Sequence, residues 1–414
     1  MKQDMADEVD IAVIGAGPAG IAAARRLIAA KADVIILEAR PRVGGRTHSV
    51  MRDGFAVDLG AGWLHSADEN PLSPLAERIG FEIDRTPPPW DQQAFNLGMT
   101  PDERAEFRAA FDAFDERVEA AAKDGPDRPA ADLFDPDCRW NARMDAVSGA
   151  LNGARFGEVS ARDYAGYEDS GVNWRVPAGY GALFAALAEG LPIALDRPVG
   201  RIDRSGPRLA LETPSGAVSA RAVIVTVPTR LIAEEAIRFD PPLPDLIEAA
   251  HGVPLGLAAK HHMAVAGAED FPKDSQLWGR TDSADTGGYH LRPFGRPMIE
   301  GYFGGPLAWG LEAEGEAAFH AFAVDEMVSL LGSDMRRRLT PLSTSMWGAD
   351  PWSRGAYSYA RPGHAGDRAR LRTPIEDRIF LAGEATCTRF YGTAHGAWME
   401  GERAAGLALQ AVAA

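Results

Sequence analysis

Residues 9–20 read V-D-I-A-V-I-G-A-G-P-A-G, and this stretch decides the fold. Its first six residues are mostly apolar and rich in branched side chains, a pattern typical of a buried parallel strand. Gly15, Gly17 and Gly20 follow at the spacing of a dinucleotide-binding loop. The first glycine permits a tight turn, the second lets backbone approach a pyrophosphate, and the third lets a helix pack on the strand. With Pro18 in the first helical turn, the sequence predicts a strand, a phosphate-binding loop and a helix to about residue 30.

The residues after this helix support a nucleotide site and favour FAD. A second strand is expected over residues 34–37, and Glu38 ends it, where a carboxylate can accept hydrogen bonds from ribose hydroxyls. The residues that follow place three arginines around a second glycine pair: Arg40, Arg42, Gly44, Gly45 and Arg46. Guanidinium groups bind pyrophosphate oxygens well. No second G-x-G-x-x-G occurs, so we expect no separate NAD(P)H domain, and a substrate must supply the electrons directly.

The remaining chain predicts further helices and strands. Residues 101–123 are expected to form a helix with one apolar packing stripe, made of Phe107, Phe111, Phe114 and Val118. Short strands with Gly-Pro and Ser-Gly turns are expected between residues 191 and 227. Later strands are expected at residues 255–265, 297–303 and 379–382, and later helices at residues 316–331 and from about residue 396. The proline run at residues 87–89 is interpreted as a crossing between domains.

Composition narrows the class of protein. A chain of 414 residues is long enough for two domains, and its net charge of -16 disfavours nucleic acid and anionic membranes as partners. No apolar run is long enough for a membrane span, and the polar, acidic N-terminus is unlike a signal peptide, so a cytoplasmic location is expected. The two cysteines, Cys138 and Cys387, are far apart in sequence and suggest neither a metal site nor a disulfide framework. Redox chemistry would therefore need a bound cofactor.

Several separated motifs, in order along the chain, carry a resemblance to a known family. They are E-A-R-P-R-V-G-G-R (38–46), D-L-G-A-G-W-L-H (58–65), P-A-G-Y-G-A-L (177–183), R-P-V-G-R-I (197–202), W-G-A-D-P-W-S-R-G-A-Y-S-Y (347–359), F-L-A-G-E-A-T (380–386) and Y-G-T-A-H-G-A (391–397). With the glycine loop, they resemble the flavin-containing amine oxidase family. The last three are most similar to its polyamine oxidase and lysine-specific demethylase branch.

The resemblance implies an α/β, two-domain fold. A Rossmann-like FAD-binding domain with a parallel sheet and helices would comprise residues 7–78, 172–250 and 375–414. An α+β substrate domain with a mixed sheet would comprise residues 79–171 and 251–374. Residues expected to hold FAD are Gly15, Gly17, Ala19, Gly20, Glu38, Arg40, Gly45, Arg46, Gly62, Trp63, Val199, Gly383, Glu384, Thr393 and Ala394.

The resemblance also implies residues at the flavin face. Lys260, in the apolar stretch L-G-L-A-A-K-H-H-M, matches the family lysine that holds a water against flavin N5; an edge-strand or snorkelling lysine is the alternative. Trp352 and Tyr357 are expected to line an aromatic cavity that holds an amine against the ring, with Trp347 either beside them or in the core. His65 falls at the substrate channel, unless it is a structural histidine.

Departures from the family pattern refine these expectations. Covalent monoamine oxidases carry a cysteine at the position of Ala356, so FAD is expected to be non-covalent. Their second cage tyrosine is replaced by Thr393, so that paired-tyrosine cage is expected to be absent. No insertion resembles the demethylase tower, which disfavours histone demethylation.

Three enzymatic hypotheses and one binding hypothesis follow. The chain is expected to be an amine oxidase that uses a small amine and O2 and forms H2O2, as a monomer or homodimer without a metal. An L-amino-acid oxidase would need an arginine to clamp a carboxylate, such as Arg175, Arg292 or another. A dehydrogenase or desaturase would pass its electrons to another acceptor, and a FAD-binding sensor would turn nothing over.

Overall fold

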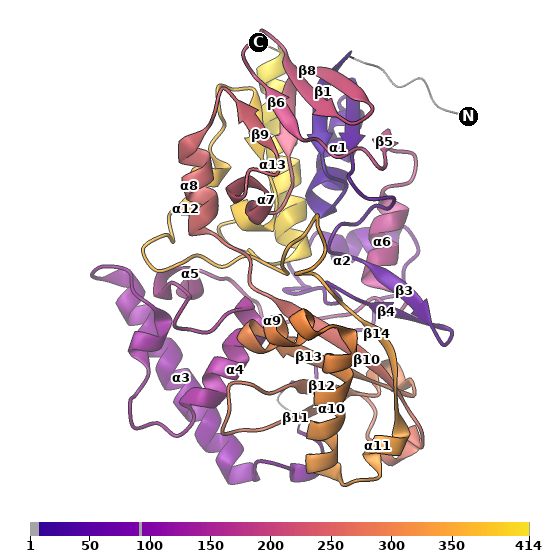
Figure 1. The fold of residues 1–414 in the computed structure, drawn as a ribbon, viewed down its shortest axis with the longest axis vertical. Helices are drawn as coiled ribbons and strands as arrows, with labels where there is room; N and C mark the ends of the chain where they lie inside the picture. Colours follow the sequence, from indigo (N-terminus) through magenta and orange to yellow (C-terminus); the bar gives the residue numbers. More distant parts are fainter. Residues whose placement is uncertain (1–7, 91–92, 414) are drawn as a thin grey trace.

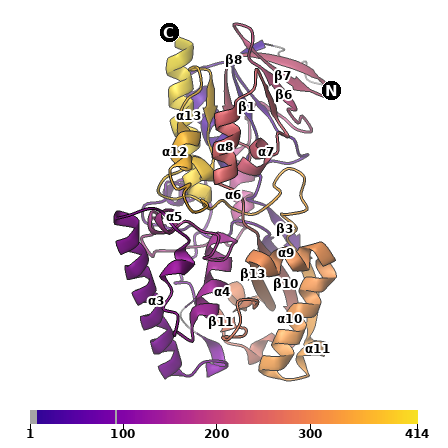
Figure 2. The same cartoon turned by 60° about the vertical axis from the view of Figure 1, so that its left-hand side comes forward.

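The computed structural model describes residues 8–90 and 93–413, which form two lobes (Figure 1). One lobe contains both ends of the described chain and is built on an eight-stranded sheet. The other lobe is built on a five-stranded sheet with helices on both of its sides (Figure 2). The two lobes therefore give the α/β, two-domain arrangement that the motifs predict.

The first sheet is assembled from distant parts of the chain in the order β5-β2-β1-β8-β7-β6-β9, with β15 also paired to β8. Its strands are β1 (Glu8–Ile14), β2 (Val34–Leu37), β5 (Ile193–Ala194), β6 (Arg201–Asp203), β7 (Leu209–Thr213), β8 (Gly216–Val225), β9 (Arg238–Asp240) and β15 (Ile379–Leu381). The pairs along β5, β2, β1, β8 and β15 are parallel, as expected for a nucleotide-binding sheet. The β6-β7-β8 meander is antiparallel, so the sheet as a whole is mixed.

Two long helices lie together against this sheet. They are α1 (Pro18–Ala29) and α13 (Ala394–Ala413), which come from opposite ends of the chain. Gly401 allows their close approach, because a Cβ there would lie 2.1 Å from the carbonyl oxygen of Ala19. Gly20 lets α1 pack on its own loop, since a Cβ there would lie 1.9 Å from the oxygen of Gly15. The contact at Gly401 brings the first and the last motif of the chain side by side.

All four strand pairings of the second sheet are antiparallel, whereas the resemblance implies a mixed sheet in this domain. Its order is β11-β12-β13-β10-β14, with bounds Ser275–Trp278 (β11), Gly288–Leu291 (β12), Met298–Gly304 (β13), Ala258–Val265 (β10) and Leu339–Thr344 (β14). Directly opposed residues on antiparallel strands point to the same face. One such row is Lys260, Tyr302, Gly288 and Trp278, and the next is His262, Glu300, His290 and Gln276. The intervening residues, such as Ala259, Met263, Leu277 and Phe303, form the core on the other face.

Helices cover both faces of this sheet. The core face packs against α9 (Gly305–Glu314) and α10 (Glu316–Leu331), followed by α11 (Met335–Arg338). On the side away from α10 lie α3 (Pro101–Lys123), α4 (Asn141–Asn152) and α5 (Ala161–Ala165), as Figure 2 shows. A capping box at Thr100 and Glu103 begins α3, and Gly153 in the left-handed region ends α4.

Shorter elements complete the fold. They are the hairpin β3 (Ser49–Arg52) and β4 (Phe55–Asp58), and the helices α2 (Leu72–Arg78), α6 (Tyr180–Leu187), α7 (Thr229–Ala233), α8 (Pro244–Gly252) and α12 (Asp367–Arg372). Within the described ranges, no helix has the length and apolar character needed to cross a bilayer.

Most predicted elements are present, with small shifts at their ends. The helices at 101–123 and 316–331 and the strand at 34–37 have the predicted bounds, whereas β10 begins three residues later than predicted and α13 two residues earlier. The proposed domain boundaries leave β1 to β9 and β15 in one domain and β10 to β14 in the other.

Candidate active site

A cavity of about 1030 Å³ extends from the glycine loop of the first lobe to the face of the second sheet that carries Lys260 and Tyr302. This volume exceeds what a single small ligand requires and suits a dinucleotide together with a substrate. Of the residues predicted to form the site, Gly20 does not line the cavity, because it packs against Gly15 instead. The others that line it are Gly15, Gly17, Ala19, Glu38, Arg40, Gly45, Arg46, Gly62, Trp63, His65, Val199, Lys260, Trp352, Tyr357, Gly383, Glu384, Thr393 and Ala394.

The glycine loop offers an open helix N-terminus to the cavity. Gly17 is the N-cap of α1, with no side-chain cap, and Pro18 follows it. A Cβ on Gly17 would meet nothing within 4 Å, so the space above the loop is available to a ligand. The unpaired N–H groups and the helix dipole at this end favour phosphate.

Glu38 holds the loop in shape from the end of β2. Its carboxylate accepts hydrogen bonds from the backbone N–H of Ala16 at 2.7 Å and of Arg40 at 2.8 Å. The side chain of Arg40 in turn donates to Asp350 at 2.6 Å and to Ser353 at 2.7 Å. Asp350 also accepts from the backbone of Trp352 at 2.8 Å, so the first flavin motif is tied directly to the W-x-x-D-P-W motif.

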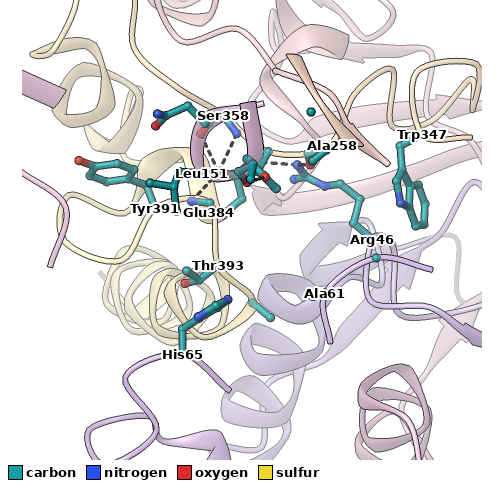
Figure 3. Close-up of a pocket in the computed structure, with 18 of the residues that line it drawn as sticks. Arg46, Ala61, His65, Leu151, Ala258, Trp347, Ser358, Glu384, Tyr391 and Thr393 are labelled. Atoms are coloured by element: carbon teal, nitrogen blue, oxygen red, sulfur yellow. Dashed lines mark hydrogen bonds and ion pairs between the residues drawn. The ribbon is translucent and has the colours of Figure 1, made fainter. Parts of the chain in front are cut away.

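A partly buried ion pair joins the first and second flavin motifs (Figure 3). The Arg46 guanidinium lies 2.9 Å from Glu384, whose other oxygen accepts from the Ser358 hydroxyl at 2.6 Å and from the Gly392 N–H at 3.0 Å. Arg46 also donates to the carbonyl of Ala356. Although burial opposes this, Arg46 and Ser358 hold the pKa of Glu384 below its usual value, so the carboxylate stays charged.

The residues around this pair fit a dinucleotide flavin. Thr393 and Ala394 bring the start of α13 to the cavity, which gives a second helix N-terminus there (Figure 3). Gly383 has space for a Cβ but adopts φ of +156°, and Val199 lines the cavity beside the end of β2. Open glycine backbone, two helix N-termini and arginines are the groups that bind a pyrophosphate, so the site fits FAD.

Lys260 lies at the centre of a charged cluster on the second sheet. Its Nζ is 3.4 Å from Glu300, and His262 Nε2 is 2.9 Å from the same carboxylate oxygen. Burial lowers the pKa of Lys260, but Glu300 and Asp58 outweigh it and raise the pKa above its usual value. Desolvation opposes the charge of the partly buried Glu300 carboxyl, but Lys260 and the hydrogen bond from His262 hold its pKa below the usual value. The cluster therefore keeps a protonated lysine in the cavity.

Gly62 leaves room for this lysine. A Cβ on Gly62 would lie 3.0 Å from Lys260 Nζ, which explains a glycine in the D-L-G-A-G-W motif. Lys260 is thus buried and paired in the cavity, and the edge-strand alternative is wrong.

Aromatic side chains form the walls next to Lys260. Tyr357 donates its hydroxyl to the carbonyl of Ala150 in α4, and its oxygen lies 3.0 Å from the hydroxyl of Tyr302 in β13. Burial raises the pKa of both tyrosines, so both hydroxyls remain protonated. Trp347 lines the cavity and is also part of the core, where its indole N–H donates to Leu59 at 2.8 Å.

His65 lies in the wall of the cavity and is also fixed structurally. Its Nδ1 is 2.6 Å from the side-chain oxygen of Asn173, and its ring lies 6.1 Å from that of Trp90. Burial lowers the pKa of His65, so the imidazole is neutral. Trp63 stands 5.0 Å from Trp90, which extends the aromatic wall.

The two arginines suggested as a carboxylate clamp are engaged elsewhere. Arg175 pairs with Asp84 and Asp274, each at 2.9 Å, and Arg292 donates to the carbonyl of Phe271 at 2.9 Å. Neither belongs to the described residues that line the cavity. The geometry therefore does not support a role for either in binding substrate.

Sequence analysis missed several residues of the site. Glu300 and Tyr302 alternate with core residues along β13, and their place opposite Lys260 depends on strand register. The helix α3 was interpreted only as packing, yet Phe107 and Phe111 also line the cavity, as does Arg143 of α4. The signal for the α3 face is its periodicity, which marks one face without saying what it covers.

The chain is similar to known proteins in sequence and in fold. The sequence profile described as flavin containing amine oxidoreductase matches residues 18–123 and 114–409. Polyamine oxidase 2 of Arabidopsis thaliana is 30% identical, over 95% of this chain and 87% of its own length. Polyamine oxidase 3 of Oryza sativa subsp. japonica is 29% identical over the same shares. A solved structure of putrescine oxidase bound to putrescine shares the fold, with a TM-score of 0.77 at 22% identity, covering 96% of this chain and 98% of that one.

Gly17→Ala and Gly20→Ala should have different effects. At Gly17 the methyl group meets only the ligand space, so the apoprotein should keep its melting temperature while flavin content falls. At Gly20 it collides with backbone, and overpacking of this kind costs about 1–3 kcal/mol or more. Thermal unfolding of the apoproteins and flavin absorbance after purification measure both. Equal destabilisation by the two variants would contradict the assignment of Gly17 to the ligand.

Proposed function

Since the chain belongs to the flavin-containing amine oxidase family, we propose that it oxidises an amine C–N bond to an imine and passes the electrons to O2, forming H2O2. Water would then hydrolyse the imine to an aldehyde and a smaller amine. Polyamines or other alkylamines are the proposed substrates. Similarity to polyamine oxidases over most of the chain supports that class.

One observation carries the proposal: a single cavity connects the glycine loop to Lys260, Trp352 and Tyr357. The flavin, bound at the loop, supplies the acceptor for a hydride from the carbon next to the nitrogen. The aromatic walls hold that carbon in place and limit water, and proximity of this kind accounts for much of an enzymatic rate. Burial lowers the pKa of His65 and raises the pKa of Tyr302 and Tyr357, so these three side chains are neutral.

Lys260 is proposed to act on the oxidative half of the cycle. Its paired ammonium group can donate a hydrogen bond into the cavity and stabilise negative charge that develops on oxygen during reduction. No general base is assigned, because a neutral amine can lose hydride without one.

The decisive experiment is a paired assay. Anaerobic addition of a polyamine or alkylamine should bleach the flavin absorbance, and aerobic turnover should yield one H2O2 per amine oxidised. An amine panel that leaves the flavin oxidised throughout would remove the proposal. Bleaching without peroxide would instead favour a dehydrogenase.

Acid precipitation should release all of the flavin into the supernatant. Ala356 offers no thiol at the position where covalent relatives attach the cofactor, and Cys387, a buried thiol elsewhere in the fold, has a raised pKa that keeps it a poor nucleophile. The supernatant absorbance after precipitation measures this. Colour retained by the protein pellet would show a covalent bond.

Glu300→Gln should make reoxidation depend on pH. Without this carboxylate, burial lowers the pKa of Lys260 with mainly Asp58 left to oppose it. Lys260 would then lose its proton as the pH rises through the new value, whereas in the wild type it stays protonated beyond 10.5. Stopped-flow oxidation of the reduced enzyme by O2 should slow at alkaline pH in the variant only.

The exposed Glu314 provides a control for that measurement. Glu314→Gln removes the same charge from the surface and should leave the pH profile unchanged. Identical profiles for Glu300→Gln and the wild type would show that Glu300 does not set the charge of Lys260.

A further inference from the structure

We propose that Arg143 binds an anionic group at the far end of the substrate, so that the preferred amine carries a carboxylate several carbons from the nitrogen. This inference rests on the proposed amine oxidase function and narrows its substrate class. Arg143 is a side chain of α4 that lines the same cavity as Lys260 and Tyr357.

Arg143 is a buried cation without a partner among the residues that the structure describes. Only 2% of the residue is exposed, and its Nε and Nη1 make no hydrogen bond. Burial lowers the pKa of Arg143 to about 9, so the guanidinium is charged at neutral pH. A buried charge of this kind is costly unless a partner is supplied.

The surroundings of Arg143 hold it in place but leave its donors free. Its guanidinium carbon lies 3.9 Å from the ring of Trp278 and 5.7 Å from that of Phe107. The carboxylate that favours its charge is Glu326, which already accepts from Thr286, Tyr289 and the backbone of Gly287. An aromatic cradle that orients a planar guanidinium is a good receptor for a carboxylate, which it can bind through two N–H groups.

Arg143 lies far along α4 from the part of the cavity next to Tyr357. Arg143 is seven residues before Ala150, whose carbonyl accepts the hydroxyl of Tyr357. At about 1.5 Å per residue the two positions are about 10 Å apart along the helix.

The second sheet gives an independent measure of the same separation. Trp278, on which Arg143 stacks, is in the row Lys260, Tyr302, Gly288 and Trp278. Three strand spacings of about 4.8 Å place Trp278 about 14 Å from Lys260. Both measures put the guanidinium too far from the flavin face to clamp the carboxylate of an α-amino acid.

The charges favour an ω-aminocarboxylate over a diamine of equal length. The distal ammonium of a diamine would approach the buried guanidinium, and like charges repel strongly in a poorly solvated site. Carboxylates are also present on α3, where Asp112 and Glu119 line the cavity, but both are exposed, so water screens them. Asp115, half buried on the same helix, accepts from Tyr164 at 3.1 Å.

The test compares ω-aminocarboxylates, monoamines and diamines of matched chain length. Rates of anaerobic flavin reduction should favour the aminocarboxylate by about 10- to 100-fold in the wild type, the range of a charged hydrogen-bonded contact. Arg143→Met should abolish this preference, and Arg143→Lys should keep part of it because it retains charge without the two-pronged geometry. Arg336→Met, which removes an exposed arginine of α11 outside the cavity, should leave the preference unchanged.

Binding of a simple alkanoate tests the anion site at Arg143 independently of the proposed amine oxidase function. An alkanoate has no amine to oxidise, so calorimetry detects the anion site without turnover; it should bind the wild type and not Arg143→Met. If no amine bleaches the flavin but the alkanoate binds, the proposed function fails and the anion site stands. Equal rates for the three substrate types, a preference for the diamine, or alkanoate affinity unchanged in a folded Arg143→Met protein would each overturn the inference.

Discussion

The ion pair between Arg46 and Glu384 is the interaction on which the site depends. It joins residues from the beginning and the end of the chain, and Glu384 is further held by Ser358 and the backbone of Gly392. Removing Arg46 would leave the buried carboxylate of Glu384 without its nearest charged partner, which is destabilising. Gly401 lets α1 and α13 pack closely, and Gly20 lets α1 pack on the glycine loop that precedes it. The same close packing brings the first and the last motif of the chain to one cavity.

On the second sheet, buried charge is compensated by residues on neighbouring strands. There, strand register places Glu300 and His262 beside Lys260, so the lysine is buried at its full charge. Neither the first motif nor the last contributes to this balance directly, although Asp58 of β4 does. The cavity therefore combines a cofactor half built on helix packing with a substrate half built on the face of a sheet. Tyr357 and Trp352 belong to residues 347–359, the segment that connects the two halves. Tyr357 contacts Tyr302 in the substrate half, and Trp352 donates to Asp350, which also binds Arg40 in the cofactor half.

The cofactor half could be predicted from sequence far better than the substrate half. Gly15, Gly17 and Glu38 act through local geometry, in which a few neighbouring residues fix the backbone, and such patterns are visible in a short stretch of chain. Glu300, Tyr302 and Arg143 act through partners that are distant in sequence. The residues next to them in the chain do not predict the strand register or which helix face lines the cavity. Tyr302 shows the difference: the family pattern placed a second tyrosine at the position of Thr393, whereas the structure pairs Tyr357 with a tyrosine from β13.

Lys260 and Arg143, two buried cations of the cavity, differ in how their charge is balanced, and this difference bears on function. Lys260 has carboxylates near it, so the folded protein stabilises its charge without a ligand. Arg143 has aromatic rings and a distant carboxylate that is already fully hydrogen-bonded, so folding alone compensates its desolvation only in part. Replacing such a group with an apolar one of similar size is often neutral or stabilising. In the proposed function of Arg143, the substrate brings the carboxylate that the free protein lacks. The unpaired charge that destabilises the empty cavity then favours the binding of substrates that carry such a carboxylate.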